Sequence, residues 1–284
     1  MPIDPQALSA MSVDDLPVTY NQQDVMLYAL GVGLCRDPAE EAELPFVSEH
    51  AGLRTLPTLA SMLIPDTVME ESGCDLRKLL HRAQSLEFFR PLPVSGELLA
   101  NQRVVSVADR GDGIGAEIEL ETEVRRASDD TVIFAGGSRV IARGDGGFGG
   151  EPPPVRSRHR MPNREPDMVC DLPTLPSQAL LFRLAGDMNP LHSDPQVAVA
   201  AGFERPILHG RCTYGIACHA ILKTVCNYDY TLIRGFDVRF SSPVFPGDVI
   251  TTEMWQDRNV VSFRCRVKAR NVVVLNNGKC TLAD

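Results

Sequence analysis

Three side chains that can hold a water molecule or move a proton fall within six residues: Asp187, Asn189 and His192. Pro190 stands among them. Its ring fixes φ and disfavours a helical conformation at Asn189, so the segment is predicted to form a defined turn. Such a turn can direct a carboxylate and an imidazole at one point, while the amide of Asn189 fixes the geometry. These residue types therefore predict acid–base chemistry.

Two helices are predicted to follow this turn. Ser193 or Asp194 can cap a short one, with Pro195 at its first position. A longer helix is expected over about residues 211–226, where apolar side chains recur at helical spacing. Gly210 would then lie at a helix N-terminus, where unpaired N–H groups and the macrodipole favour negative charge. An acid–base pair beside such an anion site suits chemistry next to a carbonyl group.

The bulk properties narrow the class of protein. A chain of 284 residues, 44% of them hydrophobic, can bury a sizeable core in one large or two modest domains. A net charge of −9 argues against a nucleic-acid partner. No apolar run approaches the roughly 18 residues that a membrane span needs. Eight cysteines without metal-type pairing, and neither a secretion signal nor a peroxisomal address, indicate a cytoplasmic protein.

The chain is predicted to contain two copies of one small domain. Residues 91–99 align with residues 242–250, and strand-like runs with polar turns follow in each case. Each copy has an apolar helix followed by antiparallel strands, consistent with a sheet wrapped around a central helix. We expect the first copy in residues 1–142 and the second in residues 178–284. Between them, residues 143–177 are rich in Gly and Pro and predict a linker.

Residues 1–20 contain three prolines and are expected to form a loosely structured lead-in. Helices are predicted at residues 24–33, 56–64 and 178–184. The predicted strands cover residues 85–92, 97–108, 115–126 and 131–142 in the first copy, and 231–241, 248–257, 259–270 and 271–282 in the second.

The motif residues, taken together, resemble a known family. Gly186-Asp187-Met188-Asn189-Pro190-Leu191-His192, followed by Pro206-Ile207-Leu208-His209-Gly210, is similar to the MaoC-like family of hot-dog-fold hydratases, and within it to the R-specific 2-enoyl-CoA hydratases (hydratase 2). The resemblance runs over nearly the whole chain. It implies an α+β double hot-dog fold, in which two tandem antiparallel sheets each wrap around a central helix, and a homodimer.

The resemblance also implies a reaction, the reversible addition of water to a trans-2-enoyl-CoA to give a (3R)-3-hydroxyacyl-CoA. Asp187 and His192 would hold the water and transfer the protons, and Asn189 would fix their geometry. The Gly210 N–H would stabilise the enolate-like thioester oxygen, by about 3–4 kcal/mol in comparable sites. Which of Asp187 and His192 is the base stays open. No metal ion or redox cofactor is required, because coenzyme A is part of the acyl-CoA substrate.

Four further positions match places where relatives contact the ligand: His81, Arg82, Arg110 and Phe240. Relatives usually have Gly where Arg82 stands and Lys where Arg110 stands; either cation at the second place can meet a phosphate. The first copy has no Asp/Asn/His cluster and is expected to form the acyl-chain pocket instead.

The remaining histidines and arginines carry weaker expectations. His209 is expected either to position the motif loop or to contact substrate. Arg205 and Arg211 lie near the motif and could contact a phosphate, but solvated surface charge is the favoured expectation for both. His50, His159 and His219 are expected to be bystanders.

Two other functions fit parts of the pattern. A 3-hydroxyacyl-[acyl carrier protein] dehydratase would apply the same chemistry to a carrier-protein thioester, and a pocket near Arg110 for the nucleotide of coenzyme A would distinguish the two. A non-catalytic acyl-CoA-binding module would have no use for Asp187, Asn189 and His192 together.

Overall fold

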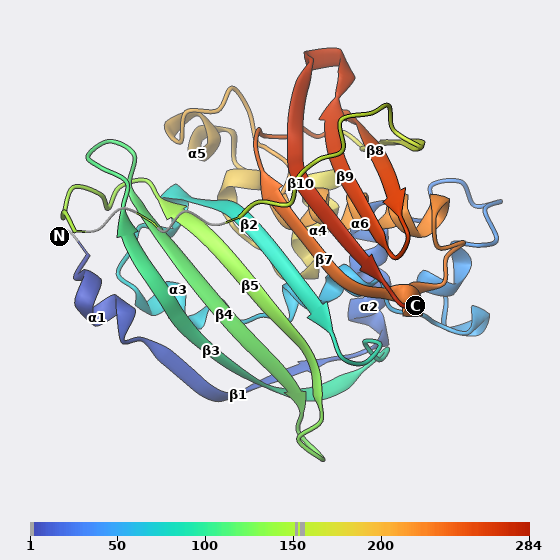
Figure 1. The fold of residues 1–284 in the computed structure, drawn as a ribbon, viewed down its shortest axis with the longest axis horizontal. Helices are drawn as coiled ribbons and strands as arrows, with labels where there is room; N and C mark the ends of the chain where they lie inside the picture. Colours follow the sequence, from blue (N-terminus) through green and yellow to red (C-terminus); the bar gives the residue numbers. More distant parts are fainter. Residues whose placement is uncertain (1–2, 151–152, 154–156) are drawn as a thin grey trace.

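The two halves of the chain build one antiparallel sheet. The computed structural model describes residues 3–150, 153 and 157–284. In this part of the chain ten strands lie in the order β1-β3-β4-β5-β2-β7-β10-β9-β8-β6. Figure 1 shows the first-half strands beside the second-half strands, joined where β2 pairs with β7. The strands are β1 (Ser12–Tyr20), β2 (Leu79–Phe88), β3 (Gly96–Asp109), β4 (Ala116–Arg126), β5 (Val132–Ala142), β6 (Met168–Pro173), β7 (Ile233–Phe240), β8 (Val249–Asp257), β9 (Val260–Val267) and β10 (Val272–Leu282).

The strand order reads the same from either edge. Counted outward from the central β2–β7 pair, β5 corresponds to β10, β4 to β9, β3 to β8 and β1 to β6. This correspondence is what two tandem copies of one domain produce, so the predicted duplication and the α+β class are confirmed.

The helices lie against one face of this sheet (Figure 1). The α-helices are α1 (Pro5–Ser9), α2 (Gln22–Val32), α3 (Thr67–Glu71), α4 (Gln178–Phe182), α5 (Pro195–Ala200) and α6 (Gly210–Thr224). The 3-10 helices are η1 (Leu44–Phe46), η2 (Glu49–Ala51), η3 (Pro57–Met62), η4 (Leu76–Lys78), η5 (Arg183–Ala185), η6 (Pro190–His192), η7 (Tyr230–Leu232) and η8 (Lys268–Arg270).

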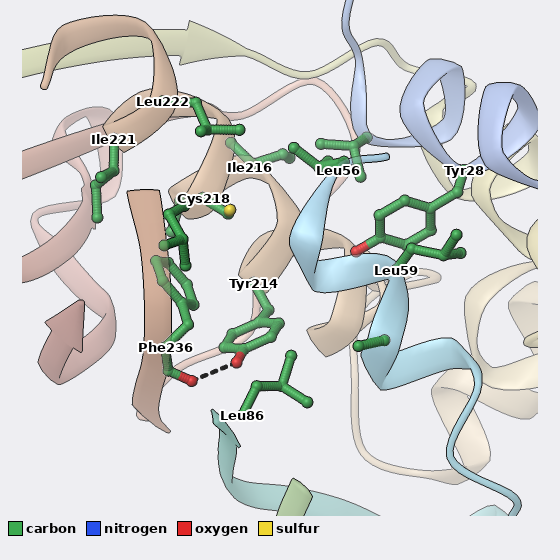
Figure 2. Close-up of a cluster of buried hydrophobic side chains, with 14 of the residues drawn as sticks. Tyr28, Leu56, Leu59, Leu86, Tyr214, Ile216, Cys218, Ile221, Leu222 and Phe236 are labelled. Atoms are coloured by element: carbon green, nitrogen blue, oxygen red, sulfur yellow. Dashed lines mark hydrogen bonds between the residues drawn. The ribbon is translucent and has the colours of Figure 1, made fainter. Parts of the chain in front are cut away.

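Helix α6 is the central helix of the second copy. It is almost completely buried, as expected for a helix enclosed by sheet and neighbouring helices. The Tyr214 hydroxyl donates a hydrogen bond to the Phe236 carbonyl on β7 (Figure 2). On the opposite side, α2 approaches so closely that a Cβ at Gly215 would lie 2.6 Å from Val32 Cγ2. The start of α6 is therefore held from both sides.

The first copy has no equivalent long helix among the described residues. The predicted helix at residues 56–64 is the 3-10 helix η3, followed by the short α3. Pro57 starts η3, and Pro65 follows it, where a proline removes a backbone donor and prevents continuation. A cavity lies beside α3, with Met69 of α3 and Leu79 of β2 in its wall.

Two sequence predictions are wrong at the sheet edges. The expected lead-in at residues 1–20 contains α1 and the edge strand β1, which pairs with β3. The expected linker at residues 143–177 contains β6, the opposite edge strand, which pairs with β8. Prolines argued against strands at both places, yet an edge strand tolerates a proline because one side of it needs no ladder hydrogen bond. Residues 151–152 and 154–156 of the expected linker lie outside the described residues.

A buried carboxylate ties α6 to the segment after α2. Glu43 is 4% exposed and accepts hydrogen bonds from His219 Nε2 and Tyr228 Oη, each at 2.7 Å. Burial disfavours its charged form, but these donors and the Cys35 N–H outweigh burial and lower the Glu43 pKa to about 2. His219, expected to be a bystander, is thus part of the packing of the helix.

In the described part of the chain, no helix has the length and apolar character needed to cross a membrane. All eight cysteines are free thiols, and seven of them are buried.

Candidate active site

The catalytic motif forms the predicted turn, as the 3-10 helix η6. Pro190 is at its first position, and the Asn189 side chain caps it by accepting a hydrogen bond from Leu191 N at 3.0 Å. Asp187 Oδ1 accepts from Asn189 N at 3.3 Å. Gly186 has φ of 123°, a conformation that side-chain-bearing residues rarely adopt, and it turns the chain from η5 into the motif. Asp194 caps α5, with Pro195 at its first position, as predicted.

Two reciprocal hydrogen bonds join this turn to the start of α6. His192 Nδ1 lies 2.9 Å from the Ile207 carbonyl oxygen, and His209 Nε2 lies 3.1 Å from the Asp187 carbonyl oxygen. A carbonyl only accepts, so each of these nitrogens carries a proton. The two rings stack with centroids 3.8 Å apart. As a result His192 presents the lone pair of Nε2, which makes it a proton acceptor at rest.

The polar groups converge at one wall of a cavity. Asp187, His192 and His209 each have an oxygen or nitrogen within 4.8 Å of one another. The cavity has a volume of about 820 Å³, and Asp187, Asn189, His192 and Gly210 all line it. All four residues predicted to be catalytic therefore share one space, large enough for a bound small molecule.

Gly210 is the first residue of α6, a helix whose start has no side-chain cap within the described residues. Its N–H is therefore available to an anionic ligand atom. A Cβ at this position would lie 3.2 Å from the Phe240 ring, so glycine allows the aromatic wall and the helix start to meet.

Three of the four predicted binding residues line the same cavity: His81, Arg82 and Phe240. Arg110 is not in its wall. It is exposed and forms an ion pair with Glu117 at 3.6 Å, while Gly113 and Ile114 of its hairpin reach the cavity. The structure thus places Arg110 beside the opening and not within the catalytic space.

Charge and burial set the protonation states around Asp187. Burial disfavours its charged form, but Arg211 and the neighbouring histidines outweigh burial and hold the pKa of Asp187 below its ordinary value. Burial lowers the pKa of His81 to about 4 and that of His209 to about 3, and it also lowers the pKa of His192. At neutral pH the site holds an ionised carboxylate among neutral imidazoles.

The expectation that Arg211 is a solvated surface charge is wrong. The residue is 7% exposed, and its guanidinium forms two hydrogen bonds with the Asp66 carboxylate, at 2.7 and 3.2 Å. Both residues line the cavity. They lie 145 residues apart, and no spacing rule connects positions so distant. Arg205, by contrast, is exposed, with its guanidinium over the Phe245 ring.

The fold and site together define a class, the double hot-dog proteins with an acid–base motif in the second copy. The MaoC like domain family matches residues 158–277, and the MFE-2 hydratase 2 N-terminal domain family matches residues 18–144. These two matches cover the two copies of the sheet. A solved Mycobacterium tuberculosis protein described as having a double hotdog fold superposes with a TM-score of 0.58 at 16% identity, covering 96% of this chain and 95% of the other.

This chain belongs to the MaoC-like hydratase 2 family. It is 39% identical to the peroxisomal enoyl-CoA hydratase 2 of Arabidopsis thaliana, across 94% of this chain and 92% of the relative. The crystal structure of a MaoC-like dehydratase from Phytophthora capsici superposes with a TM-score of 0.85 at 30% identity, covering 99% of this chain and 98% of the other. The predicted family and double hot-dog fold are confirmed.

The three cavity histidines predict how stability depends on pH. The unfolded chain protonates histidine near pH 6.5, whereas His81, His192 and His209 resist protonation in the folded state. The unfolded state then binds more protons, so the free energy of unfolding should fall as pH drops below about 6.5, by up to about 1.4 kcal/mol per pH unit for each histidine. Glu43 acts only at lower pH, because its stabilisation is lost as pH falls from its ordinary range towards about 2.

Urea denaturation at pH 7.5, 6.5, 5.5 and 5.0 measures this slope. His209→Gln should reduce the pH slope of the unfolding free energy by the contribution of about one proton, whatever the variant's stability at pH 7.5. His50→Gln changes an exposed histidine and should leave the slope unaltered. An identical slope in wild type and His209→Gln would contradict the assignment of a buried, neutral His209.

Proposed function

We propose that this protein is an (R)-specific 2-enoyl-CoA hydratase, which adds water to a trans-2-enoyl-CoA to give a (3R)-3-hydroxyacyl-CoA, and which also catalyses the reverse dehydration. The observation that carries the proposal is the convergence of Asp187, His192 and His209 within 4.8 Å beside the start of α6, in a cavity that both halves line. The relative named enoyl-CoA hydratase 2 and the match to a hydratase 2 domain support the same reaction.

The protons balance within the motif. Hydration places the hydroxyl of one water on C3 and one hydrogen on C2, so the enzyme ends with as many protons as it had at the start. Asp187 and the free Nε2 of His192 are both acceptors at rest, and between them they take a proton from water and return one to C2. The Asn189 amide orients the motif. Only protons and hydroxide move, so we propose a reaction without a metal ion or redox cofactor.

Charge that develops on the thioester oxygen needs a donor. The Gly210 N–H lies at the uncapped start of α6 and lines the cavity opposite the motif turn. This N–H is held in place before substrate binds. A hydrogen-bond donor that is already oriented in this way lowers the activation barrier most. We assign this N–H to the enolate-like oxygen of the transition state.

Coenzyme A is an anion, and an arginine cluster offers it a local site on a chain whose net charge is −9. Arg139 and Arg239 both lie opposite Ala83, on the two strands that flank β2. The pKa of Arg239 is lowered, first by burial and then by the charges of Arg82, Arg158 and Arg139. These cations therefore lie close enough to repel one another. Arg82 also lines the cavity, so the cluster is continuous with the catalytic space. We propose that it holds the nucleotide phosphates.

Asp187→Asn and His192→Ala should each reduce crotonyl-CoA hydration by about 10²–10⁴-fold, since each removes a proton acceptor. The thermal midpoint should change little. Loss of absorbance of the enoyl thioester measures the rate, and chiral analysis of the product tests the R configuration. Glu204→Gln removes an exposed carboxylate close to the motif and should retain wild-type activity. Activity within a few-fold of wild type in either motif variant would remove the mechanism.

Arg239→Gln and Arg110→Ala should raise KM for crotonyl-CoA by about tenfold, the effect of losing one charged hydrogen bond to phosphate. The same variants should leave KM unchanged for the N-acetylcysteamine thioester, which has no nucleotide. Arg103→Gln, an exposed arginine paired with Glu121 on the same sheet, is the matched control. Equal effects on both substrates would place the nucleotide elsewhere, and indifference of the enzyme to the nucleotide would favour a carrier-protein thioester.

We propose a homodimer, supported by apolar side chains that remain exposed on α4 and just after it. Leu180 is 53% exposed, Leu184 54% and Met188 55%, and Leu30 of the contacting helix α2 is 47% exposed. Exposed apolar residues gathered in one region are typical of an interface.

In multi-angle light scattering, wild type should have twice the chain mass, and the double variant Leu180→Glu, Leu184→Glu should be monomeric. Val105→Glu, at an exposed residue of β3, should stay dimeric; a monomeric wild type would refute the proposal.

We propose a reducing compartment such as the cytoplasm, supported by eight cysteines that are all free. The Arabidopsis relative is named as peroxisomal.

A further inference from the structure

The Arg211–Asp66 ion pair links the two halves of the molecule at the catalytic cavity. Arg211 follows Gly210 in the first turn of α6, and Asp66 directly precedes α3 in the first copy. The guanidinium uses Nη1 and Nη2 on the carboxylate, at 3.2 and 2.7 Å. Its Nε is buried and has no hydrogen-bond partner among the described residues. The pair therefore satisfies only part of a guanidinium that is almost wholly removed from water.

Burying the charge of Arg211 at this position is unfavourable unless nearby anions stabilise it. Removing a guanidinium from water is unfavourable, and an ion pair with a half-exposed carboxylate offsets only part of this cost. The carboxylate of Asp187 lines the same cavity. Arg211 therefore lines a cavity with two carboxylates, that of Asp66, which it binds directly, and that of Asp187 in the motif.

The other groups around Asp187 cannot take this role at neutral pH. His192 lies in the motif turn, His209 precedes α6, and His81 reaches the site from β2; burial keeps all three neutral. Arg211 keeps its charge, and of the charges that act on Asp187 it has the largest effect. The ionised state of the motif carboxylate thus depends on a cation that is outside the motif.

We propose that Arg211 is a positioning residue for hydration, which acts on the Asp187 carboxylate through the cavity that both residues line, and that Asp66 both holds Arg211 in place and offsets part of its charge. This inference rests on the proposed hydratase function. It assigns a role to two residues that lie outside the Asp187–His192 motif, one in each half of the chain.

The two partners should have opposite effects on the pH profile. Arg211→Gln removes the cation, so protonation of Asp187 and of His192 should become easier, and the acid limb of log kcat/KM should move to higher pH. Asp66→Asn leaves the cation without its counter-ion, so the same limb should move to lower pH. A purely structural clamp would be broken by either change, and both variants would then behave alike.

The experiment measures kcat/KM for crotonyl-CoA from pH 4.5 to 8 with the full-length protein. For Arg211→Gln we expect the acid limb to rise by about one pH unit, the lower end of the effect of a neighbouring opposite charge. Arg211→Lys, which keeps the charge, should return the limb towards wild type. Arg205→Gln removes an exposed arginine from the loop before α6 and should leave the limb in place.

The outcomes separate this inference from the function on which it rests. Wild type without hydratase activity would refute the function. An active wild type, with limbs that stay in place or move the same way in Arg211→Gln and Asp66→Asn, would refute the role of Arg211 alone. If Arg211→Gln does not fold, as judged by circular dichroism, the other two variants decide. The proposal is supported if the acid limb lies at lower pH in Asp66→Asn and near that of wild type in Arg211→Lys. Any other result overturns it.

Discussion

Two hydrogen bonds that cross between the motif turn and the start of α6 hold the Asp187–His192 turn against the helix. The turn donates from His192 to the Ile207 carbonyl, and the helix start returns a bond from His209 to the Asp187 carbonyl. Because a carbonyl accepts only, these bonds also fix which ring nitrogen carries the proton in each histidine. The geometry of the site and its resting protonation state thus come from the same contacts. His209 holds the motif loop through its hydrogen bond to the Asp187 carbonyl, in keeping with one of the two roles expected for it.

The asymmetry between the two halves gives the site its space. In the second copy the long buried helix α6 fills the concave side of the sheet, and its first turn is where the motif docks. In the first copy two short helices, η3 and α3, replace it, and the cavity is lined by α3 together with the strands β2 and β5. Residues of both copies line the cavity, and the Asp187–His192 turn lies in the second. Pro57 begins the short helix η3, and Pro65 follows shortly after its end.

How far the sequence predicts this structure depends on the range of the interactions involved. The hairpins, α6, the proline-bounded turn and the cap of α5 are local, and hydrophobic period, prolines and capping residues predicted them within a few residues. The two missed strands, β1 and β6, are equivalent edges of the two copies. Each is paired on one side only, so neither needs the apolar alternation or the absence of proline that identifies an inner strand. Both strands were therefore missed for the same reason.

The buried polar groups around Asp187 could not have been predicted in this way. His81 Nδ1, His209 Nδ1 and Arg211 Nε are buried and have no hydrogen-bond partner within the described chain, and each such group costs stability. A sequence pattern shows that a histidine or an arginine is present, not that distant strands and helices enclose it. These atoms are three of the nine buried side-chain atoms without a hydrogen-bond partner in the described part of the chain. Elsewhere the same chain pairs a buried carboxylate, as Glu43 with His219 and Tyr228, and there the group ties α6 to the segment after α2.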